Sequence, residues 1–322
     1  MGQNSSRKVI CKLFDPGSGP RYRLYMPAVL KPRLLPLVLL LCVLPRVWAG
    51  EQIFRVATYN VENYLDAPAA RRTAKSAESR SEVCHSILAI HPDVLALQEM
   101  GSTNALFQLQ ASLKAGGLDL PFWEQVNGFD TNIHLAVLSR FSIVARRPHT
   151  NESFLLNGRR FSVSRGFAEM NIQVSPKYTF TLIAAHLKSR LPSPLADEEE
   201  WRYEEGVALR RVIDARLATE PTRDLIVLGD FNDLKDSKPI RAIMGRGRTR
   251  LFDTKPAERG SGVTWTHFYA KEDLYSRIDY ILLSHAMEQR WLGAETYVLN
   301  STNWSVASDH RPLVAGFTVE DR

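Results

Sequence analysis

Short apolar runs that end in polar residues recur along the chain after residue 50. The run at 225–228 has four consecutive apolar residues, which predicts a strand buried on both faces. The segment 167–174 alternates between apolar and polar residues, as in a strand with one covered face. Similar patterns predict further strands at 54–61, 94–97, 135–138, 180–184, 278–283 and 313–317.

Three segments have the apolar spacing of amphipathic helices. The segment 83–90 is stopped by the His-Pro pair that follows it, and 105–113 is followed by a pair of glycines. The third, 197–217, is the longest. Many short strands with a few long helices predict an α/β fold, in which two sheets pack face to face and the helices lie outside.

No repeat, linker or low-complexity tract interrupts residues 50–322, which predicts one domain there. A simple doubly wound nucleotide-binding fold is disfavoured, because no glycine-rich loop follows the first strand. Residues 1–49 have the composition of a leader, with an apolar block at 34–44 between basic residues and the small residue Ala49. This layout predicts a cleaved signal peptide and a secreted or periplasmic protein, with Met26 as an alternative start.

The main alternative for the leader is a membrane anchor. A spanning helix needs about 20 apolar residues, and the block at 34–44 is too short for that. We therefore expect no membrane span in the mature chain. Of the three cysteines only Cys84 lies beyond the leader, so the mature chain has no internal disulfide and no implied thiol chemistry. Cys84 has helical spacing with apolar neighbours, which predicts a core position.

The formal net charge of +6 belongs to the leader rather than to the folded body. Residues 1–49 hold eight Lys and Arg and one acid, which leaves 33 basic and 34 acidic residues in the rest of the chain. Bulk charge therefore gives no general attraction to nucleic acid, although a local basic patch stays open.

Polar side chains stand at the ends of most predicted strands. They are Asn60 and Glu62, Gln98 and Glu99, His186 and Lys188, Asp230 and Asn232, Asp279, and Asp309 and His310. Each alone has a plain explanation, such as a cap, a core histidine or a surface ion pair. Together they supply what phosphoryl chemistry needs, because Glu99, Glu62 and Asp309 offer oxygen ligands to a hard cation such as Mg²⁺.

The remaining polar residues offer groups for proton transfer and charge stabilisation. Asp230, His310 and His186 are candidate acids and bases, and Asn60, Asn232 and Arg165 are candidate donors to phosphate oxygens. Neighbouring strand residues face opposite ways, so Asp309 cannot orient His310; Asp279 is the candidate for that role.

Seven motifs bring these residues into a recognisable order. They are Thr58-Tyr59-Asn60-Val61-Glu62, Leu97-Gln98-Glu99, Leu138-Ser139-Arg140, Ala185-His186-Leu187, Gly229-Asp230-Phe231-Asn232, Arg277-Ile278-Asp279-Tyr280 and Ser308-Asp309-His310-Arg311-Pro312. The ordered set spans residues 54–317 and resembles the endonuclease/exonuclease/phosphatase superfamily, most closely its deoxyribonuclease-like branch and an exported bacterial-type member.

The resemblance implies a four-layer α-β-β-α sandwich and hydrolysis of a phosphoester with Mg²⁺, or with Mn²⁺ in its place. It implies that Glu99 binds the metal, that Asp230 and Asn232 position the attacking water, and that His310 pairs with Asp279. The residues with implied phosphate or metal contacts are Asn60, Arg165 and, less directly, Glu62. His186 matches the second histidine of the deoxyribonuclease-like branch, and we take it as the acid for the leaving group.

The expected function is therefore a secreted Mg²⁺-dependent phosphodiesterase, with nucleic acid as the first candidate substrate and a monomer as the expected state. A phosphatase or phospholipase C-type esterase on lipid or sugar phosphates is the alternative, because the body is not basic. A catalytically silent phosphate-binding protein is the alternative from another class. Two details stay open: Lys188 is a phosphate contact or a surface lysine, and Trp265, His267 and Tyr269 line a groove or pack in the sheet.

Overall fold

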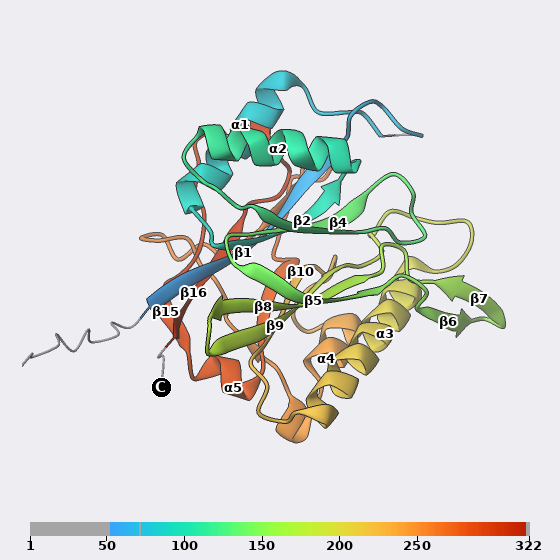
Figure 1. Ribbon diagram of the computed structural model, residues 1–322. Coiled ribbons are helices and arrows are strands. Elements are labelled where there is room, and N and C mark those ends of the chain that lie inside the picture. Colours follow the sequence, from blue (N-terminus) through green and yellow to red (C-terminus); the bar gives the residue numbers. More distant parts are fainter. Residues whose placement is uncertain (1–51, 71, 320–322) are drawn as a thin grey trace, which may run out of the picture. The chain divides into compact units, whose positions relative to one another are not determined.

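The computed structural model describes residues 52–70 and 72–319. The predicted signal peptide at 1–49 and its apolar block at 34–44 lie outside the described residues. The described part holds two six-stranded sheets with helices on their outer faces (Figure 1). No helix in this part is long and apolar enough to cross a membrane.

The first sheet is built around β1, the longest strand. Its strands, in spatial order, are β15 (Trp291–Val298), β16 (Leu313–Val319), β1 (Gln52–Tyr64), β2 (Val94–Met100), β4 (His134–Ser139) and β3 (Phe122–Val126). The pair β1 and β2 is parallel, and the other pairs are antiparallel. The outer face of this sheet is covered by α1 (Ala77–Ile90) and α2 (Thr103–Ala115).

The second sheet carries the run 225–228 at its centre. Its strands, in spatial order, are β11 (Phe252–Asp253), β14 (Asp279–Leu283), β10 (Leu225–Asp230), β9 (Tyr178–His186), β8 (Phe167–Ser175) and β5 (Ser142–His149). Here β9 and β10 are parallel. The covering helices are α3 (Glu198–Thr219) and α4 (Lys238–Met244), which lie on the side away from α1 and α2 in Figure 1.

Smaller elements connect or extend these layers. They are the hairpins β6 (Ser153–Leu156) with β7 (Arg159–Ser162) and β12 (His267–Tyr269) with β13 (Leu274–Ser276), the short helices α5 (His285–Glu288) and α6 (Trp304–Ala307), and a 3₁₀ turn at Gly247–Thr249. The hairpin of β12 and β13 lies beside the segment that carries His310, because His267 and His310 form a β-bridge.

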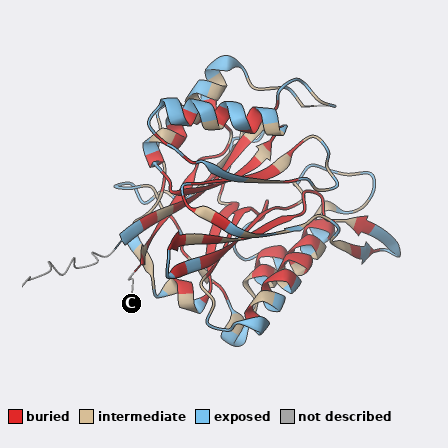
Figure 2. Cartoon of the chain, in the orientation of Figure 1, coloured by how far each residue is buried: buried red, intermediate tan, exposed pale blue. Residues whose placement is uncertain are grey.

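Three apolar cores separate the four layers. The central core joins side chains of both sheets, among them Phe54 of β1 and Phe180 of β9, whose rings stack with centroids 5.3 Å apart. The two outer cores lie between each sheet and its helices. Figure 2 shows the buried residues concentrated in the strands and on the inner faces of the helices. The predicted α-β-β-α sandwich is thus confirmed.

The predicted strands and helices all occur, with differences at their ends. The helix predicted at 83–90 begins earlier, at Ala77, because the Ser76 side chain accepts from the backbone N–H of Ser79 and caps it. There are more helices than expected, because the short helices α4, α5 and α6 were not predicted. The edge strands β3, β5 and β15 were not predicted, because their exposed faces break the apolar runs.

One glycine fixes how closely two central strands approach each other. Gly229 in β10 has φ +136°, and a Cβ placed there would lie 1.9 Å from the carbonyl oxygen of Ala185 in β9. Only glycine fits this contact. It lies one residue before Asp230, so the close approach of β9 and β10 occurs next to the polar end of both strands.

Candidate active site

Three polar residues stand side by side at the ends of three neighbouring strands of the second sheet. Asp230 of β10 is paired in register with His186 of β9 on one side and with Asp279 of β14 on the other. All three are 1–2% exposed. The buried apolar strands that precede them fix their positions, because register in such strands cannot slip without exposing the core.

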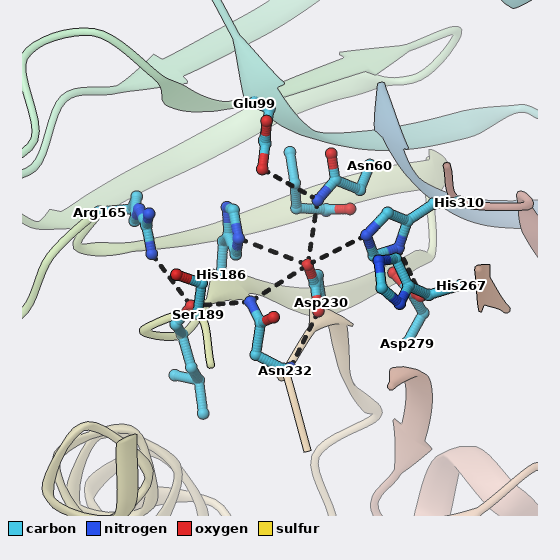
Figure 3. Close-up of polar contacts among 12 residues, drawn as sticks. Asn60, Glu99, Arg165, His186, Ser189, Asp230, Asn232, His267, Asp279 and His310 are labelled. Carbon is cyan, nitrogen blue, oxygen red and sulfur yellow. Dashed lines mark hydrogen bonds and ion pairs between the residues drawn. The ribbon is translucent and has the colours of Figure 1, made fainter. Parts of the chain in front are cut away.

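Asp230 is the centre of the polar network (Figure 3). Its Oδ1 accepts a hydrogen bond from the backbone N–H of Asn232 at 2.9 Å, and its Oδ2 accepts from Nδ2 of Asn60 at 3.0 Å. Nε2 of His186 and Nε2 of His310 lie 3.4 and 3.7 Å from the same Oδ2. Burial, aided by the nearby Asp279 carboxylate, raises the pKa of Asp230 to about 7 against the pull of His310.

Asn60 connects the two sheets at this point. Its Oδ1 accepts from the backbone N–H of Glu62 at 2.9 Å, so its Nδ2 is the atom that faces Asp230 and also Glu99, whose Oε1 is 3.4 Å away. The amide therefore donates toward one carboxylate from each sheet. A single side chain thus fixes the spacing between the carboxylates of Glu99 and Asp230.

Glu99 is aimed by an irregularity in β2. Its backbone is left-handed, with φ +63°. The pairing of β2 with β1 passes from Gln98 to Met100, and its pairing with β4 passes from Leu97 to Met100, so the register shifts at Glu99 on both sides. Such a shift turns a strand residue away from its regular face. The Glu99 Oε2 accepts from the backbone N–H of Asn63 at 2.9 Å, while the nearest guanidinium nitrogen, from Arg72, is 3.9 Å away.

His310 is oriented by Asp279, whose Oδ2 lies 2.9 Å from Nδ1 of the ring. Burial disfavours the charged ring, but the carboxylates of Asp279 and Asp230 outweigh it and hold the pKa of His310 well above its usual value. The loop before it is fixed by Ser308, whose hydroxyl donates to the Asn60 backbone carbonyl. The two carboxylates therefore favour the positively charged form of the His310 ring.

His186 has the opposite character. It is fully buried, and burial together with the positive charges of Arg165, His310 and Arg72 holds the pKa of His186 well below its usual value. A neutral imidazole of low pKa is a poor proton source. The lowered pKa disfavours His186 as the leaving-group acid, whereas the raised pKa of His310 favours the charged ring there.

The carboxylates fit a divalent cation at Glu99. Glu99 and Asp230 are two carboxyl groups that share one amide donor, and the guanidinium of Arg72 lies 3.9 Å from Glu99, the nearest cation to it among the described residues. Oxygen donors of this kind suit Mg²⁺ or Mn²⁺. Glu62 and Asp309, the other predicted ligands, are placed differently: Glu62 lies 3.3 Å from Nζ of Lys75 and accepts from the Asp309 backbone N–H.

The three acids Glu62, Glu99 and Asp309 do not converge on one point. Among residues 52–70 and 72–319, the groups of three possible ligands whose atoms lie within 4.8 Å of one another are Asp230 with Asp279 and His310, and His267 with Asp309 and His310. The structure therefore brings Asn60, Glu99, His186, Asp230, Asn232, Asp279 and His310 together, and Glu62 and Asp309 adjoin this group through Asn60 and His310, respectively.

The two predicted phosphate contacts have different surroundings. Arg165 is buried, donates to the carbonyl of Leu187 at 3.0 Å and lies on the His186 side of Asp230 (Figure 3). The ammonium of Lys188 instead donates to the carbonyls of Ser189 and Leu191 in its own loop. Lys188 is thus held by its loop rather than directed at Asp230.

Glu205 is a site residue that the sequence did not reveal. It is fully buried on α3 and accepts from the backbone N–H groups of Ser164 and Lys188, at 2.8 and 2.6 Å, and from the Ser164 hydroxyl and the Trp201 indole. It therefore ties the loops of Arg165 and Lys188 to one helix. No signal marks it, since it lies in a run of charged helical residues.

A hollow of about 800 Å³ opens beside the site. Its lining includes Glu62, Asn63, Arg72, Lys75, Asn132 and Leu191. Among the described residues of this lining, the cations Arg72 and Lys75 are matched by carboxylates, because Arg72 pairs with Asp130 and approaches Glu99, and Lys75 pairs with Glu62. Arg72 and Asp130 lie in irregular segments, where sequence patterns give no warning of a role.

The aromatic residues near 265 have mixed roles. The Trp265 ring packs against Tyr275 and Trp304, with centroids 4.9 Å away in each case, and the Arg311 guanidinium lies over it. Packing, rather than an open groove, thus accounts for Trp265. His267 in contrast faces the site, with its ring centroid 4.6 Å from that of His310.

Comparison with known proteins gives a consistent picture. A model of the Endonuclease/Exonuclease/phosphatase family matches residues 57–310. No curated protein matches the sequence. Three of the similar solved structures are the human Nocturnin catalytic domain with bound sulfate, truncated Caenorhabditis elegans TDP2 and sphingomyelinase C from Streptomyces griseocarneus.

These structures agree in fold over most of their length. Their sequence identities to this chain are 19%, 15% and 17%, and their TM-scores are 0.58, 0.58 and 0.54, in the order given. Each alignment covers 83% of this chain, with 97%, 98% and 99% of the respective neighbour. At such identities the likeness concerns the fold alone.

Proposed function

The chain belongs to the endonuclease/exonuclease/phosphatase family, and from that premise we propose that it hydrolyses a phosphoester with a divalent cation held at Glu99. The fold is of the phosphoesterase type. The observation that carries the proposal is the placement of Asp230. It accepts hydrogen bonds from Asn60 and Asn232 and lies 3.7 Å from His310, whose pKa is raised. This pairing supplies a base and a positive group on one small centre.

In the proposed reaction Asp230 orients a water molecule and accepts its proton while the water oxygen bonds to phosphorus. A pKa of about 7 suits this exchange near neutral pH. The bond from phosphorus to the leaving oxygen breaks, and His310 supplies the proton that this oxygen needs. The pair with Asp279 keeps the His310 ring in position throughout.

Other residues bind the substrate rather than move protons. Asn60 holds Asp230 and Glu99 at a fixed spacing, and Arg165 and neutral His186 offer N–H donors on the opposite side of Asp230. When bound, the cation supplies Lewis-acid polarisation of a phosphate oxygen. Glu99 is the residue we assign to hold it, and Glu62 and Asp309 are left to peripheral roles.

We take a phosphodiester as the substrate, with nucleic acid as the first candidate. A compact lipid or sugar phosphate is the second, and the charge pairing beside the site supports it. Arg72 and Lys75 are matched by nearby carboxylates, so they form no separate cationic track for a polynucleotide. The leader supports a secreted or periplasmic location, and a monomer stays the expected state.

The test is an assay of the purified protein with plasmid DNA, RNA, bis-p-nitrophenyl phosphate and sphingomyelin, with Mg²⁺ and with EDTA. We expect turnover of at least one substrate that is lost in EDTA and in Asp230→Asn. The control is Asp236→Asn, an exposed acid outside the site. Activity that survives both EDTA and Asp230→Asn contradicts the mechanism, and calorimetric binding without turnover identifies a silent ligand-binding protein instead.

A further inference from the structure

A second group of possible metal ligands lies on the outer side of His310. His267, Asp309 and His310 each offer one ligand atom, and these atoms lie within 4.8 Å of one another. His267 belongs to none of the seven motifs, and the proposed reaction does not use it. The group also differs in kind from the carboxylate at Glu99, because two of its three donors are nitrogen.

The backbone holds these side chains in a fixed relation. His267 and His310 form a β-bridge, the Phe268 N–H donates to the Asp309 carbonyl at 2.9 Å, and the Arg311 N–H donates to the Thr266 carbonyl at 2.7 Å. The hairpin of β12 and β13 is thus bonded to the catalytic segment on both sides of the bridge. Ligands on rigid, paired backbone are well suited to hold an ion.

Both imidazoles direct the same nitrogen to Asp309. Nε2 of His267 lies 3.7 Å from one carboxylate oxygen of Asp309, and Nε2 of His310 lies 3.9 Å from the other. These separations are close to the spacing of ligands around an ion with bonds of about 2 Å.

The opposite nitrogen of each ring has a partner of its own. Nδ1 of His310 lies 2.9 Å from Asp279, and Nδ1 of His267 is 3.5 Å from the Ser276 hydroxyl. In metal sites a ligating histidine almost always bonds a carboxylate or another acceptor through its second nitrogen, which fixes the tautomer. The contact with Asp279 thus leaves Nε2 of His310 as the nitrogen that a metal would take, with displacement of the proton on that nitrogen.

The donor set selects the class of ion. Two imidazoles and one carboxylate suit Zn²⁺, Co²⁺ or Ni²⁺, whereas Mg²⁺ prefers oxygen ligands and bound water. Asp309 is 41% exposed and His267 17% exposed in their side chains, so an ion can reach the group from solvent. Three protein ligands leave one position for water.

We propose that His267, Asp309 and His310 form a transition-metal site of the Zn²⁺ type, separate from the cation at Glu99, and that its occupation blocks the reaction. The block follows because the ion takes Nε2 of His310, the nitrogen that faces Asp230 and the reacting phosphate. The binding part of the proposal stands on these three side chains alone; the inhibition part rests on the proposed function.

Binding is tested with Co²⁺ added to the purified, chelator-treated full chain, read by its visible absorption spectrum. We expect bands of a nitrogen-ligated ion at one equivalent, competition by Zn²⁺, and an affinity more than about tenfold weaker in His267→Phe, since even outer partners of a metal site contribute 10- to 100-fold. The matched control is His285→Phe, because His285 is exposed and pairs only with a neighbouring glutamate, and it leaves the spectrum unchanged.

A second variant separates this site from the one at Glu99. Glu99→Gln is expected to leave the Co²⁺ spectrum and affinity intact. If Glu99→Gln removes the spectrum and His267→Phe does not, the ion sits at Glu99 and the proposal is wrong. Equal Co²⁺ affinity in His267→Phe and the parent protein overturns it as well, and so does an X-ray absorption spectrum with oxygen ligands only.

Inhibition is measured as the ratio of rates with and without Zn²⁺ at saturating Mg²⁺, each variant against its own zinc-free rate. We expect the Zn²⁺ concentration for half inhibition to rise more than about tenfold in His267→Phe and to stay constant as Mg²⁺ is raised. Relief of inhibition by Mg²⁺ contradicts separate sites. Since the Co²⁺ spectrum needs no turnover, absence of phosphoesterase activity would reject the proposed function and leave the metal site testable.

Discussion

The two sheets contribute to the candidate site in different ways. The second sheet supplies His186, Asp230 and Asp279 from strands that pair without a register shift, and all three are almost fully buried. The first sheet supplies Asn60, which ends a regular pairing, and then Glu62 and Glu99, both with left-handed backbone and partial exposure. One side of the site is therefore built from strand order, and the other from departures from it.

This difference suits the two tasks that the proposed reaction divides. Proton transfer needs groups at fixed distances in a dry environment, which the buried strand ends provide. A cation and a substrate need access from solvent, which the irregular side provides through Glu99 and the hollow next to Glu62. Substitutions on the two sides should therefore fail in different ways.

The largest effect is expected on the buried side. Asp230→Asn removes the base while it keeps the size of the side chain, so we expect kcat to fall by about 100- to 10,000-fold. Circular dichroism and thermal unfolding check that the fold is kept. A loss of less than about tenfold would mean that another group takes the water proton.

On the irregular side we expect a loss that more cation can overcome. Glu99→Gln should raise the Mg²⁺ concentration for half-maximal rate by more than about tenfold, since it removes a charged ligand. Glu62→Gln should shift it less, because Glu62 is paired with Lys75. Rates measured across a Mg²⁺ titration decide this, and equal shifts in both variants would remove the distinction that we draw between these acids.

A moderate effect is expected at the helix behind the buried side. Glu205→Gln weakens a charged acceptor of two loops, and hydrogen bonds to charged groups contribute about 1.5–3 kcal/mol each. We expect the free energy of unfolding in urea to fall by about 2 kcal/mol. We also expect a higher KM, because the loop that carries Arg165 is held less firmly. The control is Glu200→Gln, at an exposed position on the same helix. Equal stabilities of the two variants would show that Glu205 does not fix the two loops.

The last effect concerns stability alone: the free energy of unfolding of the metal-free protein should depend on pH. The pKa of Asp230 is raised to about 7, so the folded state retains a proton that the unfolded chain loses near pH 4. The Asp230 contribution to stability therefore falls as pH rises from about 4 to about 7. With the protein kept in a chelator, the melting temperature of Asp230→Asn should rise relative to that of the parent protein between pH 5 and pH 8. A constant difference between the two melting temperatures would argue against the raised pKa.

The sequence predicted the buried side better than the irregular side. His186, Asp230 and Asp279 are found at or next to the ends of apolar runs, and an apolar run is the strongest local sign of a buried strand. The left-handed backbone at Glu62 and Glu99 has no such sign, so the directions of these two side chains were not predicted. Glu205 illustrates the same limit, because its partners Ser164 and Lys188 come from loops distant in the sequence.

The stacked rings of Phe54 and Phe180 lie between the two sheets, inside the sandwich, and Asn60 bonds to both sheets at its edge. Any slide of one layer over the other changes the gap that this amide spans. A core substitution far from every polar group can thus lower the rate by moving the two carboxyl groups a fraction of an ångström apart. The rate of the reaction therefore reports on how the two layers pack.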